Sequence, residues 1–265
     1  MDIAEARNCL PQYQLAQTLR AGAQGDVFRG NAPDGRDIVV KIISGAWVQR
    51  GEREIRALAL VNHPAVVRLV GHGMVDCAGN RLPFMATEFI EGEDLRYQLD
   101  TATFHTAAAP RLVSSLAEGL DAIWAQQIVH RDIKPANIMV RPDGRGVLLD
   151  LGVARCLGMT TLTVGTGSPG TLGYLSPEQA RGVRNLTTKS DVYSLGVTAY
   201  EAVVGDHPFG RDQILMMNAS RPPTVRGRAR CSNAMADLIA AMMEPLPAMR
   251  PMPREVVTAL AGEVT

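Results

Sequence analysis

The sequence predicts an α+β protein with two lobes, a small β-rich lobe with one helix and a larger, mainly helical lobe. Up to about residue 88, short apolar runs alternate with turn signals, whereas beyond Gly92 apolar residues recur every three or four positions. Of the 265 residues, 46% are hydrophobic and 20% are charged, which is the balance of a globular protein. A chain of this length buries enough surface to form a full hydrophobic core without disulfide bonds.

Hairpin turns and one helix define the small lobe. An Asp-Gly dipeptide at 34–35 lies between two apolar runs, and a Gly-Asn dipeptide at 79–80 precedes a third. Such dipeptides are typical of hairpin turns. Between the hairpins, apolar residues at helical spacing predict a helix over 52–61, which the His-Pro dipeptide at 63–64 ends.

Helical periodicity defines the large lobe. An apolar stripe at Leu112, Leu116, Leu120 and Ile123 predicts an amphipathic helix. The segment 192–204 is apolar nearly all round, which predicts a buried central helix. The remaining expected elements are helices at 235–243 and 254–260, a hairpin turn at 142–144 and a long Gly-, Ser- and Thr-rich loop at 156–173.

Charge and cysteine content exclude several classes of protein. The 27 Lys and Arg residues balance the 27 Asp and Glu residues, and no basic arm is present, so a nucleic-acid binder is not expected. No apolar run is long enough for a membrane span, and the N-terminus has no secretory signal. The four cysteines are widely scattered and predict a reduced, cytoplasmic protein: Cys9, Cys77, Cys156 and Cys231. Four histidines form no metal-ligand pattern and are assigned no site: His63, His72, His105 and His207.

The strongest chemical signal is the string from His130 to Asn137, followed by Asp150 after a second apolar strand. Asn137 and Asp150 offer hard oxygen ligands for Mg²⁺. Asp132 can accept a hydroxyl proton, and Lys134 can neutralise a phosphoryl group in transfer. The alternative, a pair of turns with capping Asp residues, would explain either fragment alone but not the combined string.

These residues carry a resemblance to the eukaryotic-type (Hanks-type) protein serine/threonine kinases, and most of all to the bacterial members. The similarity extends from about residue 13 to residue 254, and its motifs follow in the family's order. It implies the bilobal protein-kinase fold of class α+β. It also implies one kinase domain over 1–265, with an N-lobe at 1–87, a hinge at 88–94 and a C-lobe at 95–265.

The resemblance further implies an ATP site. The segment 19–28 resembles the glycine-rich loop over the phosphates, although Arg20 stands where the family has its first glycine and Val39 where it usually has Ala. Thr87 matches the residue that guards the back pocket, and Asp94 is placed to reach the ribose, with a helix N-cap as the equally weighted alternative. The implied nucleotide contacts are Leu19, Gly22, Gly25, Val27, Val39, Lys41, Glu88, Ile90, Asp94 and Met139.

Catalytic and regulatory roles follow from the same resemblance. Lys41 would contact the α and β phosphates and pair with Glu54, while Asp132 and Lys134 act on the acceptor and the transferring group. The loop at 156–173 resembles the activation segment, with Arg131 and Arg155 as receivers of a loop phosphate; a flexible loop that is never modified is the alternative. The phosphorylation candidates are Thr163, which is favoured, then Thr161 and Thr166, with Thr160 and Ser168 also available.

Several residues are implied as structural supports. Glu178 would form a buried pair with Arg250, Asp191 would hold the catalytic-loop backbone, and Thr171 would hydrogen-bond Asp132 and Lys134. An apolar column is implied from Leu58, Leu69, His130 and Leu151.

The sequence therefore predicts a kinase that transfers the γ-phosphoryl group of ATP to Ser or Thr hydroxyls, with Mg²⁺ or Mn²⁺ as the metal. Its expected partners are protein substrates, including a second copy of itself in trans, with no nucleic acid and no membrane span in this chain. A pseudokinase that serves as a nucleotide-binding scaffold and a kinase of small molecules are the alternatives. The Ser-Pro-Glu anchor at 176–178 and Lys134 disfavour the small-molecule kinase.

Overall fold

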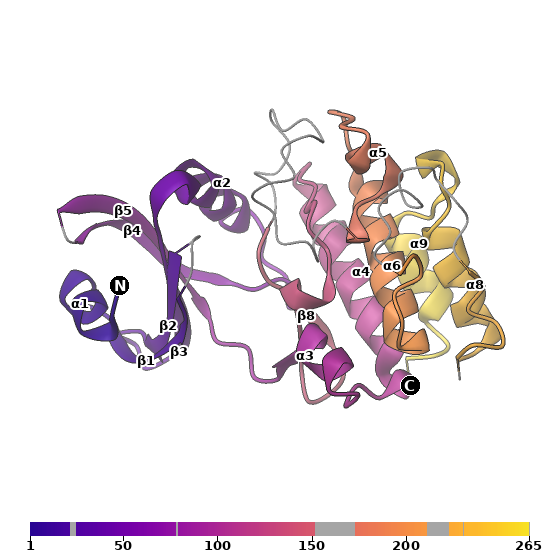
Figure 1. The fold of residues 1–265 in the computed structure, drawn as a ribbon, viewed down its shortest axis with the longest axis horizontal. Coiled ribbons are helices and arrows are strands. Elements are labelled where there is room, and N and C mark those ends of the chain that lie inside the picture. Colours follow the sequence, from indigo (N-terminus) through magenta and orange to yellow (C-terminus); the bar gives the residue numbers. More distant parts are fainter. Residues whose placement is uncertain (22–24, 78, 152–172, 211–222, 230, 265) are drawn as a thin grey trace. The chain divides into compact units, whose positions relative to one another are not determined.

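The computed structural model describes residues 1–21, 25–77, 79–151, 173–210, 223–229 and 231–264. The chain divides into two compact units (Figure 1). The small unit comprises Met1–Asn62 and Val67–Ile90, and the large unit comprises His63–Val66 and Glu91–Thr265. A β-rich unit and a mainly helical unit confirm the predicted α+β class.

The structure gives each unit its own set of elements. The small unit contains α1 (Ile3–Cys9), β1 (Gln14–Arg20), β2 (Gly25–Asn31), β3 (Asp37–Ile43), the 3-10 turn η1 (Gly45–Trp47), α2 (Val48–Leu58), β4 (Leu69–Cys77) and β5 (Asn80–Glu88). The large unit contains β6 (Glu93–Asp94), α3 (Leu95–Asp100), η2 (Thr106–Ala108), α4 (Ala109–Ala125), η3 (Pro135–Asn137), β7 (Ile138–Val140), β8 (Gly146–Leu148), α5 (Pro177–Ala180), α6 (Thr188–Val204), α8 (Asn233–Met242), η5 (Pro247–Met249) and α9 (Pro253–Leu260).

A five-stranded sheet with strand order β1-β2-β3-β5-β4 forms the small unit, and every neighbouring pair is antiparallel. The predicted turn at 34–35 is confirmed, because Gly35 has a φ of +83° and connects β2 to β3. On β3, Ile38, Val40 and Ile42 are buried in the core of this unit. Since side chains alternate along a strand, Lys41 lies on the opposite face of the sheet.

Helix α1 was not predicted from the sequence, and it overturns the prediction of reduced cysteines. Asp2 caps the helix by accepting the N–H of Glu5, and Ala6 is completely buried in the core. The helix thereby carries Cys9 to β4, where it forms a disulfide with Cys77 at a Cα–Cα distance of 5.7 Å. The scattered spacing was misleading because a disulfide requires proximity in space and not in sequence.

Helix α2 begins and ends earlier than the predicted range of 52–61. It spans Val48–Leu58, and the next two residues close tighter turns, with Leu60 N–H bonded to Ala57 O and Val61 N–H to Leu58 O. Such bonds to the residue three positions back are characteristic of a 3-10 turn. The apolar spacing therefore continues past the α-helix itself.

Two long helices form the centre of the large unit. The predicted stripe of α4 is confirmed, since Leu112, Leu116, Leu120 and Ile123 are at most 1% exposed. In α6, every residue except Lys189 and Val204 is buried, as the apolar composition predicts. Helix α4 packs against both α6 and α9. Across the described ranges, no helix combines the length and the apolarity that a membrane crossing requires.

Short strands next to these helices position the polar loops. The large unit contains a three-stranded sheet in the order β6-β7-β8. The predicted turn between β7 and β8 is confirmed, because Gly144 has a φ of +82° and its N–H bonds to Arg141 O. The hairpin places Asn137 directly before β7 and Asp150 two residues after β8.

Candidate active site

In the small unit, an ion pair joins the sheet to helix α2. Nζ of Lys41 on β3 lies 3.6 Å from Oε2 of Glu54 on α2, and the two side chains are 16% and 5% exposed. Val27 is directly opposite Lys41 on β2, and Thr87 is opposite Val39 on β5. Directly opposed side chains share a face, so Val27, Val39, Lys41 and Thr87 lie on the face of the sheet away from the core.

The start of β2 requires a glycine. Gly25 has a φ of +134°, and a Cβ at this position would overlap the carbonyl of Ile42. Leu19 and Arg20 end β1, where Arg20 is opposite Val27, while Gly22 lies outside the described residues. The backbone at Gly25 therefore approaches β3 without a side chain in between.

The segment after β5 is fixed by the sheet. The N–H of Glu88 bonds to Arg68 O, and its carboxylate accepts the N–H of Arg68. Ile90 is buried at the end of the small unit. In the large unit, Asp94 pairs with Met139 across β6 and β7, and its carboxylate accepts the N–H of Tyr97 at 2.7 Å. The N-cap alternative for Asp94 is thus confirmed.

The predicted acid–base residues of the large unit lie in contact with one another. Nζ of Lys134 is 3.1 Å from Oδ2 of Asp132. Nδ2 of Asn137 donates to Oδ2 of the same carboxylate at 3.0 Å and to the Asp132 carbonyl at 2.9 Å. Asp132 is only 7% exposed, so two side chains that donate hydrogen bonds hold a buried carboxylate in one orientation.

The buried carboxylate of Asp191 holds the backbone of the loop that carries Asp132. Oδ2 of Asp191 accepts the N–H of His130 at 2.8 Å, and Oδ1 accepts the N–H of Arg131 at 2.7 Å. Arg131 has a φ of +70°, a conformation that residues other than glycine adopt only where their surroundings impose it. The strained backbone directly before Asp132 is therefore maintained by Asp191.

Burial changes the titration of both residues in this contact. Burial raises the pKa of Asp191 to about 7, although its two backbone hydrogen bonds favour the charged form. Burial also lowers the pKa of His130 to about 4, which outweighs the opposite effect of the Asp132 carboxylate. His130 is therefore neutral at pH 7.

Asn137 and Asp150 offer the oxygen ligands that suit Mg²⁺. The N–H of Leu149 bonds to the backbone carbonyl of Asn137 at 3.0 Å, which brings the next residue, Asp150, close to Asn137. In the described part of the chain, no group of three or more His, Cys, Asp or Glu side chains is arranged to hold a metal. Mg²⁺ in phosphoryl-transfer sites uses one or two protein oxygens together with phosphate and water oxygens, and these two residues fit that pattern.

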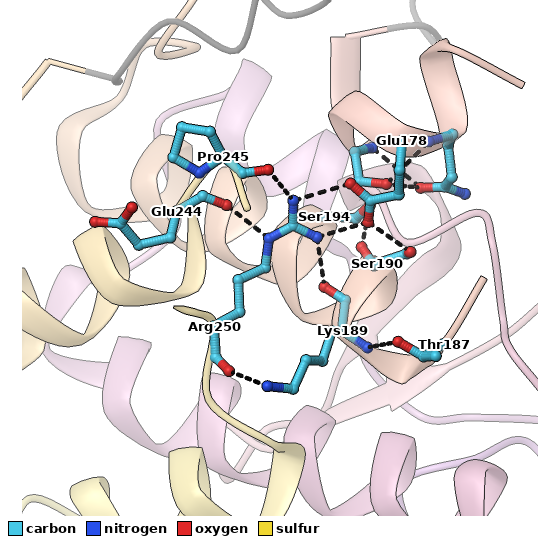
Figure 2. Close-up of polar contacts among 10 residues, drawn as sticks. Glu178, Thr187, Lys189, Ser190, Ser194, Glu244, Pro245 and Arg250 are labelled. Carbon is cyan, nitrogen blue, oxygen red and sulfur yellow. Dashed lines mark hydrogen bonds and ion pairs between the residues drawn. The ribbon is translucent and has the colours of Figure 1, made fainter. Parts of the chain in front are cut away.

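A second buried pair supports the large unit, as Figure 2 shows. Nη1 and Nη2 of Arg250 lie 2.6 and 2.9 Å from the two carboxylate oxygens of Glu178. Arg250 also donates to the carbonyls of Glu244, Pro245 and Lys189, and Ser190 donates to Glu178. Although burial alone would raise it, the hydrogen bonds from Arg250 and Ser190 hold the pKa of Glu178 below its ordinary value.

Some predicted residues lie outside the described ranges, and some contacts were not predicted. Gly22, Thr171, Arg155 and all the phosphorylation candidates, Thr163, Thr161, Thr166, Thr160 and Ser168, are outside them. In the apolar column, Leu58, His130 and Leu151 are buried and Leu69 is half-buried.

The sequence did not predict several contacts with backbone oxygens. Gln179 Nε2 donates to the carbonyl of Arg131, and Lys189 Nζ donates to the carbonyls of Ala248 and Arg250. Sequence spacing does not reveal such contacts.

Comparison with known proteins agrees with this arrangement. Residues 13–259 match the family model described as "Protein kinase domain". The chain is 35% identical over 237 residues to serine/threonine-protein kinase pkn2 of Myxococcus xanthus, covering 82% of this chain and 28% of the relative. It is 34% identical over 258 residues to a probable serine/threonine-protein kinase, PkwA, of Thermomonospora curvata, covering 96% and 34%. It is 32% identical over 226 residues to serine/threonine-protein kinase PknA of Mycobacterium tuberculosis, covering 80% and 52%. The chain thus spans between 28% and 52% of the length of these relatives.

Proposed function

Because the chain belongs to the protein kinase family, we propose that it is an ATP- and Mg²⁺-dependent protein serine/threonine kinase. It transfers the γ-phosphoryl group of ATP to Ser or Thr hydroxyls of protein substrates, a second copy of this chain included. The observation that carries the proposal is the orientation of the buried Asp132 carboxylate by Lys134 and Asn137. The names of the relatives support Ser and Thr as acceptors.

Asp132 is the proposed general base. Its carboxylate accepts the proton of the acceptor hydroxyl as the oxygen attacks phosphorus, and the leaving group is the β-phosphate oxygen of ADP. Lys134 lies beside the same carboxylate and stabilises negative charge on the transferring group. Asp191 fixes the backbone of His130 and Arg131, so the base is already oriented before substrate binds.

Asn137 and Asp150 are the proposed metal ligands. Mg²⁺, or Mn²⁺ in its place, neutralises phosphate charge when bound. The residues proposed to bind the nucleotide are Leu19, Gly22, Gly25, Val27, Val39, Lys41, Glu88, Ile90, Asp94 and Met139. Asp94 would do so through Oδ2, since its Oδ1 caps α3. Lys41 is held by Glu54 in the small unit and contacts the phosphates, so Lys41, Glu54, Asp132 and Lys134 form the proposed catalytic set.

The proposal includes domain organisation and regulation. The chain forms one kinase domain over 1–265, with an N-lobe at 1–87, a hinge at 88–94 and a C-lobe at 95–265. Thr163, then Thr161 and Thr166, are the sites of autophosphorylation in trans, and Thr171, Glu178, Asp191 and Arg250 are structural residues. We propose a cytoplasmic location because ATP is the proposed phosphoryl donor, although the Cys9–Cys77 disulfide is unusual for a reducing compartment. Thiol labelling in intact cells tests this location.

Incubation with radiolabelled ATP and Mg²⁺ tests the proposed base. We expect Asp132→Asn to slow phosphoryl transfer by about 10²- to 10⁴-fold, as loss of a positioned base does. Asp143→Asn in the exposed turn between β7 and β8 is the matched control and should keep full activity. ATP affinity, measured by calorimetry, should be similar in all three proteins.

Two outcomes contradict the proposal. Equal transfer by wild type and Asp132→Asn excludes Asp132 as the base. ATP binding without transfer by the wild-type chain favours the nucleotide-binding scaffold instead.

A further inference from the structure

His207 contacts the backbone and the side chain of the segment that precedes α5. Its Nε2 lies 2.9 Å from the carbonyl oxygen of Gly173. Its ring meets the ring of Tyr174 edge-on, with centroids 5.2 Å apart and planes at 89°. One imidazole therefore touches two successive residues of this segment.

Hydrogen bonding determines which nitrogen of His207 carries the proton. The carbonyl of Gly173 can only accept, so Nε2 must carry a hydrogen. The N–H of Phe209 donates to Nδ1 at 3.2 Å, so Nδ1 must be unprotonated. His207 is thus held as one neutral tautomer that connects Gly173 to the turn after α6.

The absence of a side chain at Gly173 allows this approach. A Cβ at position 173 would lie 3.1 Å from Nε2 of His207, closer than the neighbouring ring could tolerate without moving. The hydroxyl of Tyr174 donates to Glu201 of α6 at 2.5 Å, and Glu201 in turn accepts from Arg96 of α3 at 2.7 Å. The two residues are therefore anchored at the backbone by His207 and at the side chain by α6.

The anchored residues belong to a segment that reaches the candidate base. Ser176 and Gln179 form a capping box at the start of α5, and Nε2 of Gln179 donates to the carbonyl of Arg131 at 3.2 Å. Arg131 directly precedes Asp132 in the chain. The segment 173–179 is therefore fixed at one end by His207 and joined at the other end to the loop that carries the base.

We propose that His207 is a positioning residue for the protein substrate. By holding Gly173 and Tyr174, it fixes the segment that Gln179 joins to the loop of Asp132, and we place the acceptor polypeptide against this segment. This role rests on the proposed kinase function and extends it to a histidine to which the sequence assigned no site. Substrate affinity, rather than nucleotide affinity, is the property that His207 controls.

Two amide substitutions separate the two hydrogen bonds of His207. The longer side chain of His207→Gln places an amide nitrogen near the position of Nε2 and keeps a donor for Gly173. The shorter side chain of His207→Asn places its amide oxygen near the position of Nδ1 and keeps only the acceptor for Phe209. The protein acceptor is this same chain carrying Asp132→Asn, which should label itself about 10²- to 10⁴-fold more slowly than wild type if Asp132 is the base.

We expect His207→Asn to raise the KM for the acceptor about fivefold, the effect of one neutral hydrogen bond. His207→Gln should restore the KM to near the wild-type value, and Gly173→Ala should raise it as His207→Asn does. The KM for ATP and kcat at saturating acceptor should not change. His105→Asn, which alters an exposed histidine, is the control.

Two results would overturn the proposal: an unchanged acceptor KM in His207→Asn, or an equal rise in the Gln and Asn variants. If the KM is unchanged in the Asn variant but rises in the Gln variant, His207 serves only the local turn. Failure of the proposed kinase function would look different from failure of the His207 proposal. Wild type would then transfer no phosphoryl group, while ¹⁵N spectra of the imidazole would still show a protonated Nε2 and an unprotonated Nδ1. A spectrum with Nδ1 protonated at neutral pH overturns the His207 proposal whatever the activity.

Discussion

The two units hold their charged site residues in different ways. In the small unit, Lys41 and Glu54 meet at 3.6 Å across two separate elements, β3 and α2. In the large unit, Glu178 and Arg250 meet at 2.6 and 2.9 Å, and Arg250 has three further carbonyl partners. A buried charge with many partners has one low-energy geometry, whereas a longer ion pair between two elements can open and close. The comparison indicates a fixed structural support in the large unit and an adjustable lysine in the small unit.

Removal of Arg250 is the strongest test of the fixed geometry of the buried pair in the large unit. We expect Arg250→Met to lower the free energy of unfolding by about 3–5 kcal/mol, because it leaves the carboxylate of Glu178 buried without its partner. Urea unfolding followed by circular dichroism measures the loss. Arg254→Met, at an exposed arginine of α9, is the control and should change stability by at most about 0.5 kcal/mol. A similar small change in Arg250→Met would remove the contrast between the units.

The disulfide provides a covalent constraint in the small unit, away from the ion pair. Reduction of Cys9–Cys77, or the double substitution to Ser, should lower the free energy of unfolding by about 2–4 kcal/mol, since the bond joins residues 68 positions apart. Thermal unfolding with and without reductant measures this effect. Cys231→Ser removes a free thiol and should leave the response to reductant unchanged. An equal response in the Cys9/Cys77 double variant would show that the bond does not form.

His130 makes the large unit sensitive to acid. Its pKa is about 4 in the folded protein against 6.5 for an ordinary histidine, so the unfolded chain binds the proton more readily. The stability that neutral His130 contributes should therefore be fully present above pH 6.5 and fall by up to about 3 kcal/mol as the pH decreases towards 4. Asp191, whose pKa is raised to about 7, has the opposite effect on stability over this range, because the folded protein binds its proton more readily than the unfolded chain does. The difference between the urea midpoints of wild type and His130→Phe across this range measures the slope due to His130, which the variant should lack. His105→Phe, at an exposed position, should leave the slope in place.

The smallest expected effect on stability is at the adjustable ion pair. Glu54→Gln keeps the shape of the side chain and an oxygen that can accept a hydrogen bond from Lys41, so it should change the free energy of unfolding by only about 1 kcal/mol. Phosphoryl transfer should nevertheless fall about tenfold, which is about 1.4 kcal/mol in the activation barrier. Glu52→Gln, with a side chain 45% exposed on the same helix, is the control for both measurements. Loss of stability without loss of activity would assign Glu54 a purely structural role.

Local patterns account for the parts of the fold that the sequence predicted correctly. The turns at 34–35 and 142–144 need a residue with positive φ, and glycine supplies it at Gly35 and Gly144. The apolar stripe of α4 and the all-round apolar surface of α6 are visible at helical spacing. The order of Asp132, Lys134, Asn137 and Asp150 along the chain likewise predicted the kinase family that the comparisons show.

The sequence by itself determined the fold class, the family and the residue types of the candidate site, because these depend on periodicity and on motif spacing. Only the tertiary structure revealed the Cys9–Cys77 disulfide, the carbonyl partners of Arg250 and the single tautomer of His207. The disulfide, the contact of Arg250 with Lys189 and the contact of His207 with Gly173 join residues 68, 61 and 34 positions apart, and the last two are made to a backbone oxygen that every residue possesses. No pattern of side chains along the sequence can encode such a contact, since it exists only after the chain has folded.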